Sequence, residues 1–303
     1  MLFNSVHFLI FAPVVMAVTF LLPQRLQRWW LLLASLYFYA VANVVFLIPL
    51  LFCIGITYVL VRWMVSVESQ VQKRIALLGV IFGNLGILYS LKYMDLSFWV
   101  WNHTLGLRPC DPWYAHSLGM ILPMGISFFT LMAIGYGVDV YRGFEGRRSF
   151  LDTALFLSVF FHLVAGPILR GRDLIDQFAQ KIGWSWENFE LGIRQICLGI
   201  VKKTFLADNI SPTVDAIFAA PAQMHWVSLL LSVFLHSFQI YCDFSGYSDI
   251  AIGSARILGF HIPENFNRPF LSLTMTEMWR RWHISFSSWV RDYVYFPLGG
   301  SRT

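Results

Sequence analysis

Residues 29–61 read WWLLLASLYFYAVANVVFLIPLLFCIGITYVLV and contain no Asp, Glu, Lys or Arg. Five further runs are free of charge in the same way: residues 1–22, 75–91, 114–138, 153–169 and 216–242. A helix needs about 20 apolar residues to cross the hydrocarbon core of a bilayer. The runs therefore predict a polytopic all-α membrane protein whose first partner is the lipid bilayer.

The composition agrees with this prediction. Charged residues make up 13% of the 303 residues, against about 25% in an average soluble protein. This deficit excludes a disordered chain and argues against two ordinary soluble domains, so we expect residues 1–303 to form a single membrane-embedded domain. The net charge of +5 includes no long basic block, so no nucleic-acid partner is expected. Cysteine and histidine spacings of metal sites are also missing from the sequence, and neither a metal nor a bound cofactor is predicted.

Helix length and loop charge make predictions about topology. As a single helix, residues 29–61 would be about 50 Å long, which predicts a break near Ala42 and Asn43. Residues 151–169 are expected to form a further span. Lys and Arg in alternate loops then number eight on one side and five on the other, with Arg142 on the richer side and Arg170 and Arg172 on the poorer. The positive-inside rule then favours a non-cytoplasmic N-terminus.

Two later segments are less apolar. Residues 184–209 are amphipathic and predict an interfacial or short re-entrant helix. Residues 243–270, DFSGYSDIAIGSARILGFHIPENFNRPF, combine carboxylates, glycines and prolines. At membrane depth such a stretch is tolerated only where it is buried in protein or lines a water-filled cavity. The sequence therefore predicts a bundle with a polar interior.

The first group of candidate site residues lies in residues 236–249. His236, Gln239 and Asp243 share one face of a helix at spacings of three and four residues. They could form a hydrogen-bond network that ties helices together, or they could contact a substrate. Asp249 and Arg256 also share a face, and we expect them to form an ion pair across two turns.

The second group lies in residues 276–300, TEMWRRWHISFSSWVRDYVYFPLGG. Aromatic side chains recur there at helical spacing, with Arg280, His283 and Ser287 on a neighbouring face. Glu277 can reach Arg280 or Arg281 within a turn. The pattern fits an interfacial helix whose arginines extend to lipid headgroups. It also fits the mouth of a cavity that binds an anionic, phosphate-bearing donor.

Five segments resemble one family, in the order in which its motifs occur. They are LPMGISFFTLMAIGYGVDVYRG (122–143), LVAGPILRGRDLIDQF (163–178), LGIVKKTFLADNI (198–210), YCDFSGYSDIAIGSARILGFHIPENFNRPF (241–270) and WRRWHISFSSWVRDYVYFPLGGSR (279–302). They resemble the membrane-bound O-acyltransferases, and more narrowly the bacterial branch that acetylates exopolysaccharides such as alginate.

The resemblance implies a ring of transmembrane helices around a central tunnel in the bacterial inner membrane. It implies acetyl-CoA as the donor substrate on the cytoplasmic side. A periplasmic acetyltransferase partner and the polysaccharide secretion machinery are the expected protein partners.

The resemblance also implies roles for individual residues. His283 matches the first family histidine, in a supporting role, and Arg280 and Arg281 would line the donor side or the mouth of the site. The cavity would be shaped by Asp243, Ser245 and Asp249, with His236 and Gln239 nearby. The principal catalytic histidine of the family lies further on, in a Gly-Leu-Trp-His-Gly type segment beyond Thr303. We therefore expect a fold that is incomplete at its C-terminus and a chain that is inactive by itself. The alternative is a membrane transporter or a non-enzymatic assembly subunit.

Overall fold

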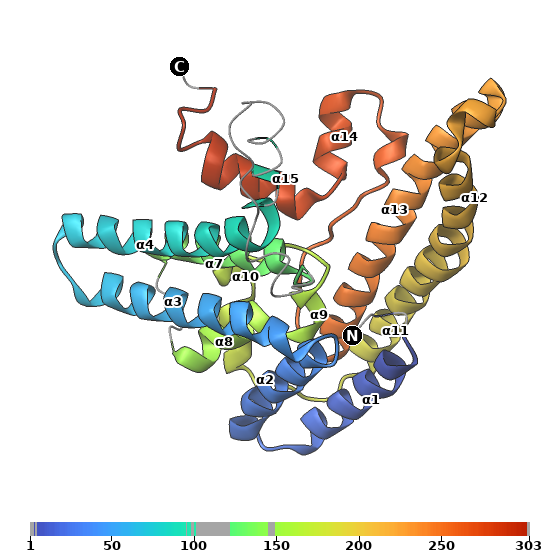
Figure 1. Ribbon diagram of the computed structural model, residues 1–303. Coiled ribbons are helices and arrows are strands. Elements are labelled where there is room, and N and C mark those ends of the chain that lie inside the picture. The colour runs from blue at the N-terminus through green and yellow to red at the C-terminus, as the bar shows by residue number, and fades with distance from the viewer. Residues whose placement is uncertain are drawn as a thin grey trace.

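The computed structural model describes residues 3, 5–94, 96–97, 100, 122–144 and 149–301. Across these residues the regular elements are helices (Figure 1). Three described helices are long and apolar enough to cross a membrane, namely Val44–Ser66, Gln70–Tyr93 and Trp226–Ile257. Two more, Val6–Leu21 and Ile126–Tyr141, are apolar but shorter. The prediction of an all-α membrane protein is confirmed.

The first three helices show the predicted break. Helix α1 (Val6–Leu21) and helix α2 (Gln24–Ala40) meet at Pro23, and α3 (Leu47–Ser66) begins after a single 3-10 turn. The side chain of Asn43 accepts a hydrogen bond from the N–H of Val45 at 2.9 Å and so caps this turn. The break predicted near Ala42 and Asn43 is therefore confirmed.

Helix α4 (Gln70–Leu88) packs between α3 and α7 (Ile126–Tyr141). At one end Lys92 donates to the hydroxyl of Ser127, and at the other Arg74 donates to the hydroxyl of Tyr141. These contacts join opposite ends of the two sequences, so α4 and α7 are antiparallel. Figure 1 shows α3 and α4 as a long hairpin with α7 beside it.

Residues 150–174 enter the bundle and turn back. Helix α8 (Phe150–Ser158) starts beside α2, where Asp152 pairs with Arg28 at 2.9 Å. Helix α9 (Phe160–Leu163) then reaches the N-terminal end of α7, where the backbone of Leu163 lies so close to Gly125 that a Cβ atom would not fit. The chain next runs without a helix to α10 (Gly171–Leu174).

The expected span over residues 151–169 is therefore wrong. Arg142 donates to the backbone carbonyl of Asp292, and Arg170 pairs with the carboxylate of the same residue. Both arginines thus lie at one end of the helices, although a span between them would have separated them. The cause is local, because Val159 is extended and Gly166 has a φ of 140°, so neither helical piece is long enough to cross.

A 3-10 helix (Ile175–Ala179) and a short loop follow α10, and residues 186–219 then form one long helical run. Helix α11 (Trp186–Ile200), a π-helical stretch (Val201–Ala207) and α12 (Asp208–Ala219) follow one another without a gap. They pack along α13 (Trp226–Ile257), as Figure 1 shows. The crossing is tight, since a Cβ atom on Gly199 would lie 2.6 Å from the carbonyl oxygen of Gly246.

The prediction of a short re-entrant helix for residues 184–209 is wrong, because most of them belong to the continuous helical run 186–219. The alternative, an interfacial helix, stays a prediction. Carboxylates of α13 neutralise the lysines of this run. Lys202 pairs with Asp249 and Lys203 pairs with Asp243, each at 2.6 Å. Asp249 consequently faces Lys202 instead of forming the expected pair with Arg256. Packing of the two helical runs places Lys202 against Asp249, whereas Arg256 is two turns away along α13 itself.

The C-terminal part is a loop followed by two short helices. Residues 258–274 lead to α14 (Met275–Arg281), which is followed by α15 (Ile284–Val290) and a π-helical turn (Arg291–Tyr295). The loop backbone bridges the break between these helices. The N–H of Asn267 donates to the carbonyl of Arg281, and the N–H of Ile284 donates to the carbonyl of Asn265, both at 2.9 Å.

We expect Gly199→Ala to destabilise the fold, because its Cβ atom would meet the backbone of α13 and force the two helices apart. The expected cost is about 2 kcal/mol, seen as a lower Tm of the detergent-solubilised protein. Gly55→Ala is the matched control, since a Cβ atom there would meet nothing within 4 Å. An equal Tm for both variants would contradict the tight crossing.

Candidate functional site

His283 lies in the break between α14 and α15. Its backbone is in the left-handed region, with a φ of 42° and a ψ of 55°. Such a conformation is uncommon for residues other than glycine, and it is often found at functional sites when the surrounding structure enforces it. Here the enforcement comes from the backbone bridges between the loop 258–274 and residues 281 and 284.

Aromatic rings surround the imidazole of His283. Phe244 on α13 meets it edge-on at a centroid distance of 4.7 Å, and Phe286 on α15 lies 5.2 Å away. Phe128 on α7 and Phe266 in the loop stack against it, each at 6.4 Å. Burial among these rings lowers the pKa of His283 to about 4, so the ring is neutral at physiological pH.

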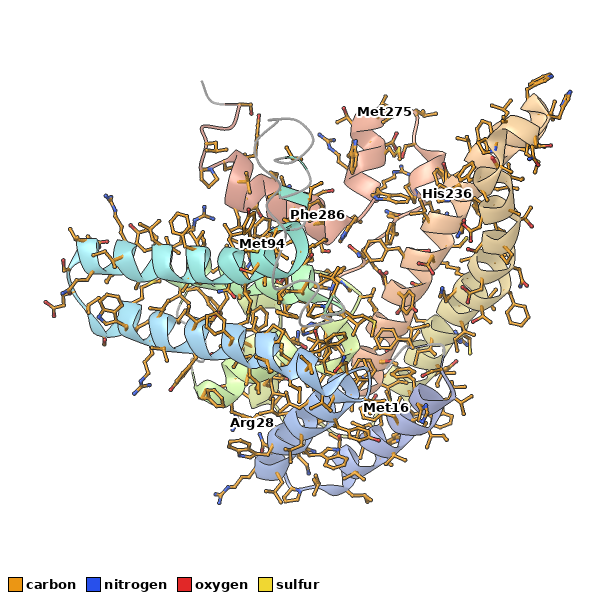
Figure 2. All side chains as sticks on the ribbon, in the orientation of Figure 1. Met16, Arg28, Met94, His236, Met275 and Phe286 are labelled. Atoms are coloured by element: carbon orange, nitrogen blue, oxygen red, sulfur yellow. The ribbon has the colours of Figure 1, made fainter. Side chains whose placement is uncertain are left out.

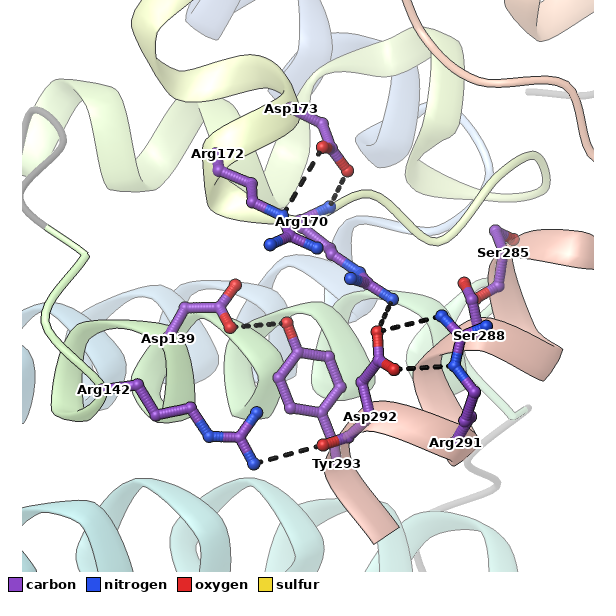
Figure 3. Close-up of polar contacts among 10 residues, drawn as sticks. All are labelled: Asp139, Arg142, Arg170, Arg172, Asp173, Ser285, Ser288, Arg291, Asp292 and Tyr293. Atoms are coloured by element: carbon purple, nitrogen blue, oxygen red, sulfur yellow. Dashed lines mark hydrogen bonds and ion pairs between the residues drawn. The ribbon is translucent and has the colours of Figure 1, made fainter. Parts of the chain in front are cut away.

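A basic cavity of about 630 Å³ lies at the C-terminal end of α7. It is lined by Arg142 and Asp139 from α7, by Arg170 and Arg172 at the start of α10, and by Asp292 and Tyr293 after α15. Figure 3 shows how these side chains meet: the hydroxyl of Tyr293 donates to the carboxylate of Asp139 at 2.7 Å. The guanidinium groups of Arg142 and Arg170 each lie 5.6 Å from the centre of the Tyr293 ring.

Two further cavities continue this polar surface towards His283. One of about 420 Å³ shares Arg170 and Arg172 with the basic cavity and extends to Ser285. Another of about 520 Å³ shares Ser288 and Arg291 with the second and adds Arg280. Ser285 is two residues from His283. Arginine-lined cavities thus extend from the end of α7 to Ile284 and Ser285, the two residues that follow His283.

Asp292 organises the arginines of this surface. It pairs with Arg170 and Arg291, and its backbone carbonyl accepts from Arg142. Burial opposes its ionisation, but the hydrogen bonds and charges of Arg291 and Arg170 outweigh that effect and hold the pKa of the carboxyl below its usual value of 3.8. The ionised carboxylate fixes Arg170 at the wall shared by the cavities of about 630 and 420 Å³.

The predicted residues of the C-terminal helix lie near this site. Arg281 pairs with Glu277, as expected from their spacing, and Arg280 lines the 520 Å³ cavity with Arg291. The roles expected for Arg280, Arg281 and His283 at the donor side or mouth stay predictions.

The predicted residues of α13 lie elsewhere. Nδ1 of His236 lies 3.3 Å from Oε1 of Gln239, on the half of α13 that packs against α12 (Figure 2). Asp243 and Asp249 point to the lysines of the adjoining helical run. Ser245 is buried, and its hydroxyl has no hydrogen-bond partner among the residues that the structure describes. The structure does not bring these residues together with His283, and their expected role in shaping the cavity stays a prediction.

Several site residues were not among the predicted ones. They are Asp139, Arg142, Arg170, Arg172, Asn265, Ser285, Asp292 and Tyr293. Asp139 had a detectable signal, because a carboxylate in an otherwise apolar helix is expected to have a partner. The others come from segments up to about 150 residues apart, and spacing within one segment cannot pair them.

Comparison with known proteins identifies the class of protein. The family model of the membrane-bound O-acyltransferase family matches residues 35–303. The chain belongs to this family.

Among curated relatives, the chain is 39% identical to a probable alginate O-acetylase of Pseudomonas aeruginosa, with 100% of the chain and 58% of the relative aligned. It is 33% identical to a peptidoglycan O-acetyltransferase of Helicobacter pylori, over 100% of the chain and 62% of the relative. A teichoic acid D-alanyltransferase of Bacillus subtilis is 32% identical over 57% of the chain and 44% of the relative. The chain thus spans about three fifths of the length of the first two relatives.

Asp292→Asn is expected to lower the Tm at neutral pH, because the ion pairs with Arg170 and Arg291 are lost. The folded-state pKa of Asp292 lies below its unfolded value, so its contribution is present above the unfolded value and fades as the pH falls through the folded one. Tm values of the wild type and the variant should therefore converge below about pH 4. Asp215→Asn is the control, since Asp215 is exposed and accepts from the Ser211 hydroxyl. A Tm gap for Asp292→Asn that persists unchanged at pH 3 would contradict the assignment.

Proposed function

We propose that the full-length protein transfers an acetyl group from a cytoplasmic thioester donor, acetyl-CoA, for the O-acetylation of an exopolysaccharide such as alginate. The observation that carries this proposal is the neutral His283, held in a break at the end of a row of arginine-lined cavities. In acyl transfer, a hydroxyl oxygen attacks the thioester carbonyl, the sulfur leaves, and the hydroxyl proton passes to a base. A neutral imidazole can accept a hydrogen bond from such a hydroxyl, whereas a protonated one cannot.

The arginine-lined surface supports an anionic donor. Guanidinium groups bind phosphate oxygens through paired, charge-assisted hydrogen bonds. Arg142, Arg170 and Arg172 gather at one cavity, and Asp292 holds one of them in place. A donor whose phosphates bind there could extend its thioester towards Ser285 and His283 along the adjoining cavity.

The location of the basic residues supports an orientation. Three arginines lie at the C-terminal end of α7, namely Arg142, Arg170 and Arg172. At the same end Arg74 donates to the hydroxyl of Tyr141. Loops rich in Lys and Arg remain on the cytoplasmic side of a membrane. The proposed protein is therefore a multi-pass component of the bacterial inner membrane with its donor cavity facing the cytoplasm. It would act with a periplasmic acetyltransferase partner and the polysaccharide secretion machinery.

His283→Ala in the full-length protein should lower transfer of radiolabelled acetyl from acetyl-CoA to polymer by roughly a hundredfold, because the hydrogen-bond acceptor is lost. Insertion into the membrane should be unchanged. His7→Ala is the control, since His7 lies on the exposed face of α1. Unchanged acetylation in His283→Ala would overturn the role of this residue.

The double variant Arg142→Gln, Arg172→Gln should raise the KM for acetyl-CoA roughly tenfold or more while changing kcat little, because charge-assisted bonds to the donor are lost. Arg194→Gln is the control, on an exposed face of α11 where Arg194 pairs with Glu190. An unchanged KM would show that the donor does not bind at this cavity.

The relatives are longer than this chain, so both measurements are made on the full-length protein. The inactivity expected of these 303 residues alone stays a prediction, and the same acetyl-transfer assay on the isolated chain measures it.

A further inference from the structure

One buried side chain connects His283 to three other parts of the fold. Asn265, in the loop 258–274, is fully buried. Its Oδ1 lies 3.1 Å from Nδ1 of His283, 2.8 Å from the hydroxyl of Ser285 and 3.3 Å from the backbone nitrogen of Ser285. Its Nδ2 donates to the hydroxyl of Ser248 on α13 at 3.3 Å.

The orientation of the Asn265 amide follows from its neighbours. The backbone N–H of Ser285 can only donate, so the amide atom that faces it must be the oxygen. The hydroxyl of Ser285 already accepts from the N–H of Ile168 at 2.9 Å, and it is free to donate its own proton to the same oxygen. A flipped amide would place its NH₂ group against the N–H of Ser285 and lose that hydrogen bond.

This orientation determines the protonation of the histidine ring. Because Nδ1 of His283 faces an oxygen that can only accept, Nδ1 must carry a proton. A neutral imidazole has one N–H, so Nε2 then carries the lone pair. Among the described residues, Nε2 has no hydrogen-bond partner, and the ring is partly accessible.

No charged group among the described side chains faces the ring directly. Its neighbours are Phe128 on α7, Phe244 on α13, Phe266 and Asn265 in the loop, and Phe286 and Ser285 on the same helix. None of these titrates near neutral pH. The neutral ring and its tautomer therefore depend on burial and on Asn265.

We infer that Asn265 is a positioning residue for the acyl-transfer site: it holds His283 as the Nδ1–H tautomer and leaves Nε2 free to accept a hydrogen bond in the site, in the supporting role of this histidine. The inference rests on the proposed function for the identity of the group that Nε2 meets. The effect of Asn265 on the protonation of His283 does not depend on that function and can be measured separately.

The test uses Asn265→Asp in the purified full-length protein and diethyl pyrocarbonate, which reacts with an unprotonated, accessible imidazole nitrogen. The rate of modification at His283, read by mass spectrometry, should be constant from pH 5.5 to 7.5 in the wild type. In the variant a buried carboxylate replaces the amide and favours the protonated ring. The rate should then fall about fourfold as the pH is lowered from 7.5 to 5.5 if the pKa rises by about two units.

Ser248→Ala is the matched control. It leaves Nδ2 of Asn265 without its partner, at a comparable cost in stability, but keeps the oxygen on His283. Its modification rate should stay constant with pH. A rate that falls equally in this control, or no change in Asn265→Asp, would overturn the inference. So would an unreactive His283 in the wild type under conditions in which His7 is modified.

Acetyl transfer supplies the second readout. Asn265→Ala should lower kcat with an unchanged KM for acetyl-CoA, and Asn265→Asp should restore part of kcat with the acidic limb of its pH profile moved upwards. An Asn265→Ala variant with wild-type kcat would overturn the inference. If modification of His283 responds as expected but His283→Ala transfers acetyl normally, the proposed function fails and the tautomer assignment stands.

Discussion

Backbone groups that lie inside a membrane protein need hydrogen-bond partners within the protein, and this constraint governs the centre of the molecule. Residues 164–170 and 258–268 lie outside the helices, and Ile168 and Asn265 within them are buried. The hydroxyl of Ser285 accepts from the N–H of Ile168 in the first segment, and the amide of Asn265 in the second binds Ser285. The side chains of Ser285 and Asn265 thereby connect the two irregular segments through hydrogen bonds. The left-handed backbone of His283 is a consequence, because the chain must break between α14 and α15 to place Ser285 there.

The same arrangement separates two environments a short distance apart. On one side of Ser285, aromatic rings from three helices and the loop enclose a neutral histidine. On the other side, arginines from α7 and the turn before α10 line water-accessible space. The proposed acyl transfer would use both, because a charged donor must be held while the reacting atoms are kept from bulk water. The course of residues 150–174, which turn back towards their starting end, returns Arg170 to the end of α7 beside Arg142.

Charge neutralisation explains the remaining part of the fold. The run from α11 to α12 carries lysines that an apolar environment would not accept alone. Asp243 and Asp249 on α13 pair with them, and the glycine crossing brings the two helices close enough for that contact. Within the described residues these carboxylates pair with lysines of the neighbouring helical run, so they hold the two helical runs together.

The amino-acid sequence by itself determined the class of fold, the break near Asn43 and the family. These features depend on local composition, on hydrogen bonds between near neighbours or on the order of motifs, and all of these can be read from the linear sequence. Only the tertiary structure decided that Asp249 binds Lys202, that residues 151–169 turn back, and that Asn265 holds His283. Helical periodicity relates residues three or four positions apart, whereas these contacts join different elements. A buried polar group takes the partner that packing brings nearest, and that partner is set by how the helices assemble.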